Sequence, residues 1–343
     1  MRLGDTSGSE REGSPVPELA CPYRGTDPYD TTDAGWFFGR TATAAQLISR
    51  LQDRTTLVVA GPARCGKSSL VRAGLLPRIS AGALPGSGEW PRSVLTPGEH
   101  PLDNLWSALG ELAGSPLPDI FSLEEAPGAA AARYIQEGVL VVDQLEELFI
   151  ASCDQAERGA FFGVLQGLHN LNRPGLRLIL VVGTDFYGLC AAIPWLASAI
   201  SDNHLLVEPM SRDELREAVE GPARRAGLRL EEGLADRVLD QAGDDPLALA
   251  RTSQALQRTW ELRKARLLTL EGYEEVCRLD EGGAGRSGSD GPVAPEERAA
   301  SPGNAGPPYT APSAPAMAPG GDGGALNSGQ PPARRKSLRF RRH

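Results

Sequence analysis

Short apolar runs alternate with helical spacing through the first two thirds of the chain. Residues 57–60, 139–142 and 178–182 are continuous aliphatic runs, as in strands that are buried on both faces of a parallel sheet. Residues 205–207 form a further short run. Apolar residues at helical spacing predict helices near these strands, over 42–51, 68–79, 161–171 and 188–200. The alternation predicts an α/β fold.

The pattern changes at both ends and after residue 209. We expect a disordered lead over residues 1–20 and a disordered, Gly- and Pro-rich tail with a basic end over 281–343, because both compositions leave little to bury. After Pro209 no further strand is predicted, and helical patterns cover 211–220, 233–242, 247–263 and 270–276. A core over 21–208 and a helical, lid-like or winged-helix-like part over 209–280 are therefore expected.

Composition narrows the classes of protein that fit. The chain has 343 residues, 41% of them hydrophobic, and a net charge of −9, although six Arg or Lys lie in the last ten residues. Nucleic-acid binding is therefore not expected, except weakly through the basic end, for which a solvated run is the alternative. The cysteines show no zinc-site or disulfide spacing. Without a secretory signal or an apolar run of about 18 residues, we expect a cytoplasmic protein that does not enter a membrane.

One motif stands between a predicted strand and a predicted helix. Residues 61–68 read Gly-Pro-Ala-Arg-Cys-Gly-Lys-Ser, the pattern GxxxxGK[ST] of a phosphate-binding P-loop. Backbone N–H groups and the helix N-terminus would converge on phosphates there. Lys67 would neutralise the β and γ oxygens, and the Ser68 hydroxyl would bind Mg²⁺. The core is thus predicted to be a P-loop NTPase whose nucleotide-binding residues include Gly61, Pro62, Ala63, Arg64, Cys65, Gly66, Lys67, Ser68 and Ser69.

Cys65 lies inside this loop, just before the helix N-terminus and two residues from Lys67. Both features favour a thiolate. An accessible Cys65 would therefore be reactive, and a bound nucleotide would protect it. The alternative is an inert thiol at a variable position of the motif.

Acidic residues follow the run at 139–142. Asp143 ends this predicted buried strand and is the candidate second anchor for Mg²⁺; a carboxylate in a solvated loop is the alternative. Glu146 and Glu147 lie within a turn of it, and one of them could polarise an attacking water as a catalytic base. Spacing does not decide between the two, and either could be an acid that a helix dipole favours.

Seven blocks of the sequence together resemble the novel STAND NTPase domain, a bacterial relative of the apoptotic and NACHT ATPases. They are CPYRG (21–25), WFFGR (36–40), the P-loop with SLVRAGLLP (69–77), PGEHP (97–101), DQLEELF (143–149), DFY (185–187) and MSRDEL (210–215). The resemblance covers about residues 21–278 and implies an additional-strand P-loop core followed by helices. It also implies a switch that is closed with ADP and assembles, as a homo-oligomer, with ATP. The sequence does not indicate a protein partner.

The resemblance also suggests contacts to the base and ribose. Phe38, Gly39 and Arg40 would lie by the adenine and ribose, and the alternative is a hydrophobic anchor before the next helix. Residues 243–246 are similar to a Gly-x-Pro turn that touches adenine from the lid side. For Pro246, a plain helix start is the alternative.

Two departures from the family pattern bear on activity. Family members carry an arginine that senses the γ-phosphate after the fourth core strand, whereas this chain reads Gly-Thr-Asp-Phe-Tyr over 183–187. Arg177 cannot replace it, because it lies on the strand itself, about six residues before the end. The usual WD-repeat propeller is replaced by the tail after residue 281.

We therefore expect a STAND-type switch that binds ATP or ADP with Mg²⁺, with slow or impaired hydrolysis. The alternatives are a competent ATPase and a non-catalytic adaptor or truncated remnant. The choice between ATP and GTP is left open.

Overall fold

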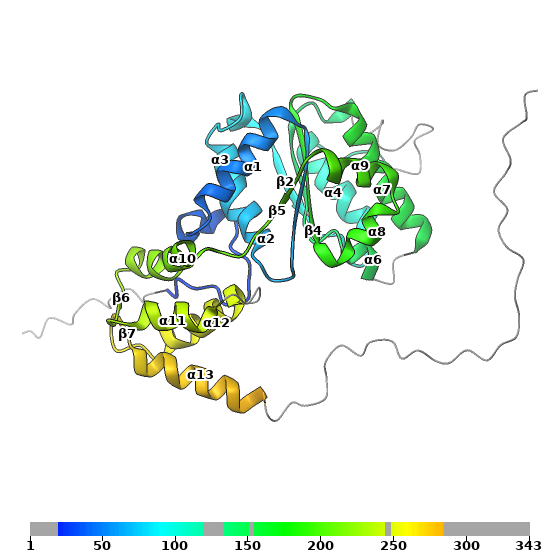
Figure 1. Cartoon of the computed structure of the whole chain (residues 1–343). Coiled ribbons are helices and arrows are strands. Elements are labelled where there is room, and N and C mark those ends of the chain that lie inside the picture. The colour runs from blue at the N-terminus through cyan, green and yellow to red at the C-terminus, as the bar shows by residue number, and fades with distance from the viewer. Residues whose placement is uncertain (1–19, 119–132, 151–153, 244–247, 285–343) are drawn as a thin grey trace, which may run out of the picture. The chain divides into compact units, whose positions relative to one another are not determined.

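The computed structural model describes residues 20–118, 133–150, 154–243 and 248–284. Its centre is a five-stranded parallel sheet in the order β2-β3-β4-β1-β5 (Figure 1). The strands are β1 (Thr56–Gly61), β2 (Arg92–Leu95), β3 (Gly138–Val142), β4 (Leu176–Gly183) and β5 (His204–Leu206). Helices lie on both faces of this sheet, so the predicted α/β class is confirmed.

The longest apolar runs became the central strands. Every residue of β1, β3 and β4 is buried, as expected for strands covered on both faces. Strand β5 begins one residue earlier than predicted. Strand β2 was not predicted, because Arg92-Ser-Val-Leu alternates in burial at the sheet edge and carries too few apolar residues to stand out.

Strand β4 lies between the P-loop strand β1 and the Asp143 strand β3, which confirms the additional-strand arrangement. Gly61 pairs with Gly183, and Val142 with Leu180. Because all three strands are parallel, their carboxyl ends meet at one edge of the sheet, where open α/β sheets bind ligands.

Two apolar cores flank the sheet. One packs α4 (Pro101–Ala113), α7 (Gln155–Leu171) and α9 (Pro194–Asp202) against it; the other packs α1 (Thr41–Asp53) and the helix that follows the P-loop. The helix predicted over 188–200 is broken, into α8 (Tyr187–Ala191) and α9, because Pro194 begins the second piece. Shorter elements are η1 (Thr31–Trp36), η3 (Ser87–Glu89), α6 (Glu147–Ile150) and η5 (Thr184–Phe186).

The helix after the P-loop is not uniform. It runs as α2 (Lys67–Ser69), a π-helical turn labelled η2 (Leu70–Leu75) and α3 (Leu76–Ser80). Pro77 has no N–H, and its ring would clash with the carbonyl four residues earlier in a regular α-helix. The wider π turn, closed by the bond from Leu76 N–H to Val71 O, precedes the proline. Such turns are frequent at functional sites.

After β5 the described chain is mainly helical: α10 (Arg212–Arg225), α11 (Leu234–Ala242), α12 (Ala248–Glu261) and α13 (Leu270–Ala284). A capping box at Ser211 and Glu214 starts α10. The expectation of no strand after Pro209 is wrong, because β6 (Arg229–Leu230) pairs with β7 (Leu267–Leu268). These two-residue strands are too short for a periodic signal. Helix α13 extends beyond the predicted end at residue 276.

Residues 20–30 join the helical part from the other end of the chain. Tyr23 is buried in its core and donates a hydrogen bond from Oη to Val219 O at 2.7 Å. No helix in the described part of the chain is both long and apolar enough to cross a membrane.

Candidate nucleotide site

The P-loop connects β1 to α2 by a tight turn. Gly66 takes the left-handed conformation at φ 91°, and so does Arg64 at φ 60°. Gln144, directly after Asp143, is likewise left-handed at φ 56°. For residues other than glycine this conformation costs about 1 kcal/mol, and it clusters at functional sites. Both loops at this edge of the sheet therefore hold backbone strain.

The Lys67 ammonium is held at the mouth of the loop. Its Nζ donates to Gly61 O at 3.0 Å and to Pro62 O at 2.9 Å, and the residue is 8% exposed. Gly61 and Pro62 thus contribute carbonyl groups that position the lysine. The ammonium can donate three hydrogen bonds, so one donor is left for a phosphate oxygen.

Asp143 is brought to Ser68 as the motifs predicted. Its side chain is 1% exposed, and Oδ1 accepts from Ser68 Oγ at 2.9 Å. Oδ2 accepts from Arg72 Nε at 3.0 Å, within an ion pair to the same guanidinium. No role was expected for Arg72 from the sequence, although Arg72 lies one helical turn after Ser68 and so on the same face.

The two glutamates point to different partners. Glu146 Oε2 accepts from Gly183 N at 3.1 Å, at the outlet of β4, and the residue lines the cavity described below. Glu147 Oε2 accepts from Gly98 N at 2.8 Å, in the loop after β2. The two carboxylates thus lie in different places: Glu146 lines the cavity, whereas Glu147 holds the loop after β2.

A cavity of about 380 Å³ opens over the P-loop, within the range of small-molecule sites. Its walls come from residues before β1, from the P-loop, from the end of β3 and from α10 and α12. Predicted site residues that line it are Phe38, Arg40, Ala63, Arg64, Gly66, Lys67, Ser68, Ser69, Asp143 and Glu146. We call it the P-loop cavity.

The P-loop cavity is also lined by residues for which no site role was expected from the sequence. On the N-terminal side they lie within 23–29, and Tyr29 N donates to Ser69 Oγ at 3.1 Å. On the helical side, Leu215, Ala218 and Val219 come from α10, and Leu249, Ala250, Thr252, Ser253 and Leu256 come from α12. Only the CPYRG block hinted at the first group, and no local pattern distinguishes the second from ordinary helix residues.

The turn at 38–40 has a packing role besides its place at the cavity. Phe38 lies against Gly221 of α10, so closely that a Cβ at Gly221 would be 2.5 Å from the ring. Gly39 lies against Glu214 O, and Arg40 Nη2 donates to Glu208 O at 2.9 Å. Burial lowers the pKa of Arg40. Both the ligand role and the anchor role considered for this turn remain compatible with its position.

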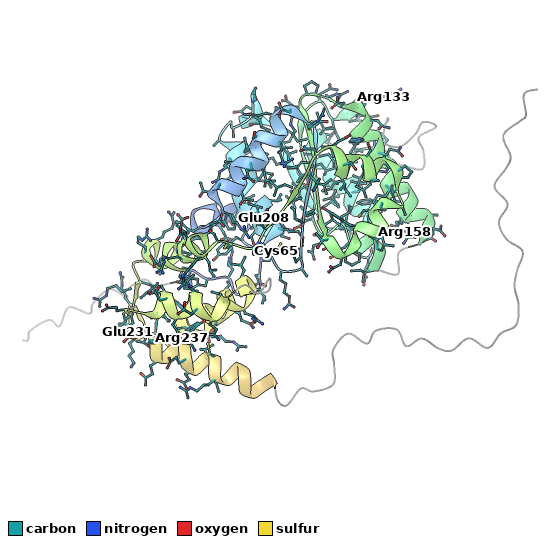
Figure 2. All side chains as sticks on the ribbon, viewed as in Figure 1. Cys65, Arg133, Arg158, Glu208, Glu231 and Arg237 are labelled. Carbon is teal, nitrogen blue, oxygen red and sulfur yellow. The ribbon has the colours of Figure 1, made fainter. Side chains whose placement is uncertain are left out.

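Cys65 does not have the properties of a reactive thiol. It is 5% exposed, and burial raises its pKa, against the lowering effect of Lys67 and Arg40. Cys65 is labelled in Figure 2, together with Glu208. The Glu208 carbonyl accepts the hydrogen bond from Arg40. Of the two alternatives for Cys65, burial thus favours the inert thiol, because removal from water outweighs the neighbouring positive charges.

No arginine follows β4 at residues 183–187. Arg177 lies at the start of that strand, where Nε donates to Leu51 O at 2.9 Å and the guanidinium lies 5.3 Å from the Trp90 ring centroid. The Arg177 side chain is therefore held at the start of β4 and not at its end, in line with the expectation that it cannot replace the missing arginine. The predicted adenine contact Pro246 lies outside the described residues.

The oxygen donors suit a magnesium ion. Ser68 Oγ and the Asp143 carboxylate are hard ligands side by side, and Mg²⁺ is commonly held by one or two protein groups together with waters and substrate phosphates. No cluster of three or more His, Cys, Asp or Glu able to hold a metal occurs in the described ranges.

The fold has known counterparts. The chain resembles the ORC2 protein of Aeropyrum pernix, described as ADPNP–ADP complexes, at 17% identity and a TM-score of 0.52, over 71% of this chain and 68% of that one. It is also similar to a Walker-type ATPase of Pyrococcus abyssi (16% identity, TM-score 0.49, 75% and 76% covered). A third similarity is to the RuvB branch migration motor of Thermotoga maritima (14% identity, TM-score 0.43, 71% and 70% covered).

Sequence comparison gives a more specific result. No protein with curated annotation matches this chain. The family model described as Novel STAND NTPase 1 matches residues 22–284. This range takes in the P-loop, Asp143, the parallel sheet and the helices after β5. The chain therefore belongs to the novel STAND NTPase 1 family.

Proposed function

We propose that the chain is a nucleotide switch that binds ATP or ADP with Mg²⁺ in the P-loop cavity. This proposal rests on one observation: the cavity is lined both by the phosphate loop and by helices α10 and α12. A ligand in the cavity would touch both parts at once. The presence or absence of a γ-phosphate could then bias how the two parts are held together, which is the requirement for a ligand-driven switch.

The roles of the phosphate-binding groups follow from their positions. The N–H groups at the start of α2 and the Lys67 ammonium would hold the phosphate oxygens. Ser68 and Asp143 would hold Mg²⁺, which when bound neutralises charge on the β and γ oxygens. Phe38 and Arg40 would contact the rest of the nucleotide.

Slow hydrolysis is proposed because residues 183–187, at the end of β4, contain no arginine to stabilise the developing charge on the γ-phosphate. Loss of such a group commonly lowers turnover by orders of magnitude. One observation favours the alternative of a competent ATPase: Glu146 faces the cavity beside Asp143 and could polarise a water. We propose Glu146, and not Glu147, for that role.

The test is calorimetric titration of the full chain with ADP and ATP in the presence of Mg²⁺, together with a phosphate-release assay. Lys67→Ala is expected to weaken binding by at least about tenfold, because it removes a charge-assisted contact. Lys264→Ala is the matched control, since Lys264 is exposed and pairs with Glu271. Equal affinity of the wild type and Lys67→Ala would refute the proposal, and rapid phosphate release would favour the competent ATPase. Absence of binding by the wild type would favour a non-catalytic adaptor.

A further inference from the structure

The Asp143 carboxylate has no acceptor position left over. Oδ1 accepts from Ser68 Oγ at 2.9 Å and from Gln144 N at 3.1 Å. Oδ2 accepts from Arg72 Nε at 3.0 Å and lies 2.9 Å from Arg72 Nη2. An ionised carboxylate offers about four lone-pair positions, so these contacts fill the group.

A metal ion, or a water bound to it, needs one of those positions. The bond from Gln144 comes from the backbone of a strained turn, and Ser68 is itself a proposed ligand. Ser68 would thus stay beside Asp143, and the Arg72 guanidinium is the donor that can leave without moving either the backbone or a proposed ligand. Its side chain is 22% exposed, against 1% for Asp143, so part of the Arg72 side chain already reaches water and the guanidinium can rotate toward it.

The location of Arg72 supports such a movement. It lies in the π turn η2, where the helical hydrogen-bond pattern changes between α2 and α3. Two other cations near the loop are bound to carbonyl groups: Lys67 to Gly61 O and Pro62 O, and Arg40 to Glu208 O. The ion pair that neutralises buried Asp143 is the one to Arg72.

We propose that Arg72 is a built-in competitor of the metal ion at Asp143. The guanidinium neutralises the carboxylate while the metal is absent and gives up Oδ2 when the metal engages Asp143. Arg72 would then set the Mg²⁺ concentration at which the site becomes loaded. This inference rests on the proposed function in that it takes Asp143 as the metal anchor.

The experiment uses the full chain and three variants. Arg72→Gln removes the charge. Arg72→Lys keeps the charge but replaces the planar guanidinium, which can donate two bonds side by side, with a single ammonium group. The control is Arg78→Gln, because Arg78 lies on α3 and donates to Gly74 O in the preceding π turn, not to Asp143. The melting temperature is measured against Mg²⁺ concentration, with Mg²⁺ alone and with ADP, and ADP affinity is measured in EDTA and in Mg²⁺.

We expect Arg72→Gln to melt at a lower temperature than wild type in EDTA, because a buried carboxylate loses its counter-charge. Mg²⁺ should raise the melting temperature of this variant again. The Mg²⁺ concentration that gives half of the maximal rise should be about tenfold lower than for the wild type, since a charge-assisted contact no longer competes. Arg72→Lys should fall between the two, and Arg78→Gln should match the wild type. A variant that folds only with Mg²⁺ would also support the proposal.

An unchanged or higher half-maximal Mg²⁺ concentration in Arg72→Gln would overturn the inference. Arg72 would then position the Asp143 carboxylate while the metal is bound and would not compete with it. If Arg72→Gln does not fold under any condition, the same comparison is made with Arg72→Lys, and an unchanged value there overturns it. Failure of the proposed function has a different signature: the wild type would bind no ADP at any Mg²⁺ concentration.

Discussion

Glu146 and Glu147 have the same chemistry and adjacent positions, but their carboxylates are used differently. Glu146 accepts from Gly183 N beside the cavity, and Glu147 accepts from Gly98 N. We predict that Glu146→Gln lowers phosphate release by about a hundredfold, the lower range for loss of a general base. It should leave ATP affinity equal or higher, because a negative charge near the phosphates is removed. Glu147→Gln is the matched control and should change neither quantity. A loss confined to Glu147→Gln would contradict this assignment.

Some residues of the candidate site could be predicted from the sequence, and others could not. The P-loop and Asp143 could be predicted because each has a fixed spacing after an apolar run. The different positions of Glu146 and Glu147 could not, because they depend on the backbone N–H groups of Gly183 in β4 and of Gly98 in the loop after β2. Arg72 was not recognised, since its partner lies 71 positions away. The choice between a reactive and an inert Cys65 was left open, because nearby charges are visible in a sequence whereas burial is not.

Helix α10 is joined to the turn before α1 by a close approach at one glycine. A Cβ at Gly221 would lie 2.5 Å from Phe38 Cγ. We predict that Gly221→Ala destabilises the protein by about 1–3 kcal/mol through overpacking. It should also weaken ADP binding, because Phe38 lines the cavity. The measurements are chemical denaturation and calorimetric titration.

Gly163→Ala in α7 is the control for this prediction, because a Cβ there meets nothing within 4 Å. In a helix interior such a change should stabilise the protein by about 0.5–1 kcal/mol. The two substitutions are thus expected to have opposite signs. If Gly221→Ala stabilised the protein as Gly163→Ala does, the packing of α10 against Phe38 would not be as described.

The elements themselves were predicted unevenly, for physical reasons. The buried strands β1, β3 and β4 have no polar residue that interrupts their apolar runs, apart from Arg177 near the start of β4. Edge strand β2 and the two-residue pair β6 and β7 carry no such signal. The π turn depends on Pro77 and on hydrogen bonds that no periodicity reveals.

At the scale of the whole described molecule, one cavity joins segments that lie far apart in the sequence. Residues 23–29, the P-loop, the end of β3 and helix α12 all line it. Their convergence could not be derived from the sequence, because nothing local shows that α12 lies over the loop. Family resemblance predicted that helices follow the core, but not which of their residues face the nucleotide.

The most direct measurement is hydrogen exchange of the full chain, read by mass spectrometry, with and without Mg²⁺ and ADP. A nucleotide in the P-loop cavity should slow exchange in two separate segments together, the P-loop at 61–69 and α12 at 249–256. Helix α7, which does not line the cavity, should be unchanged, and Lys67→Ala should abolish both effects. Protection of the P-loop without α12 would contradict a ligand shared by the two parts, and protection of neither would contradict nucleotide binding in this cavity.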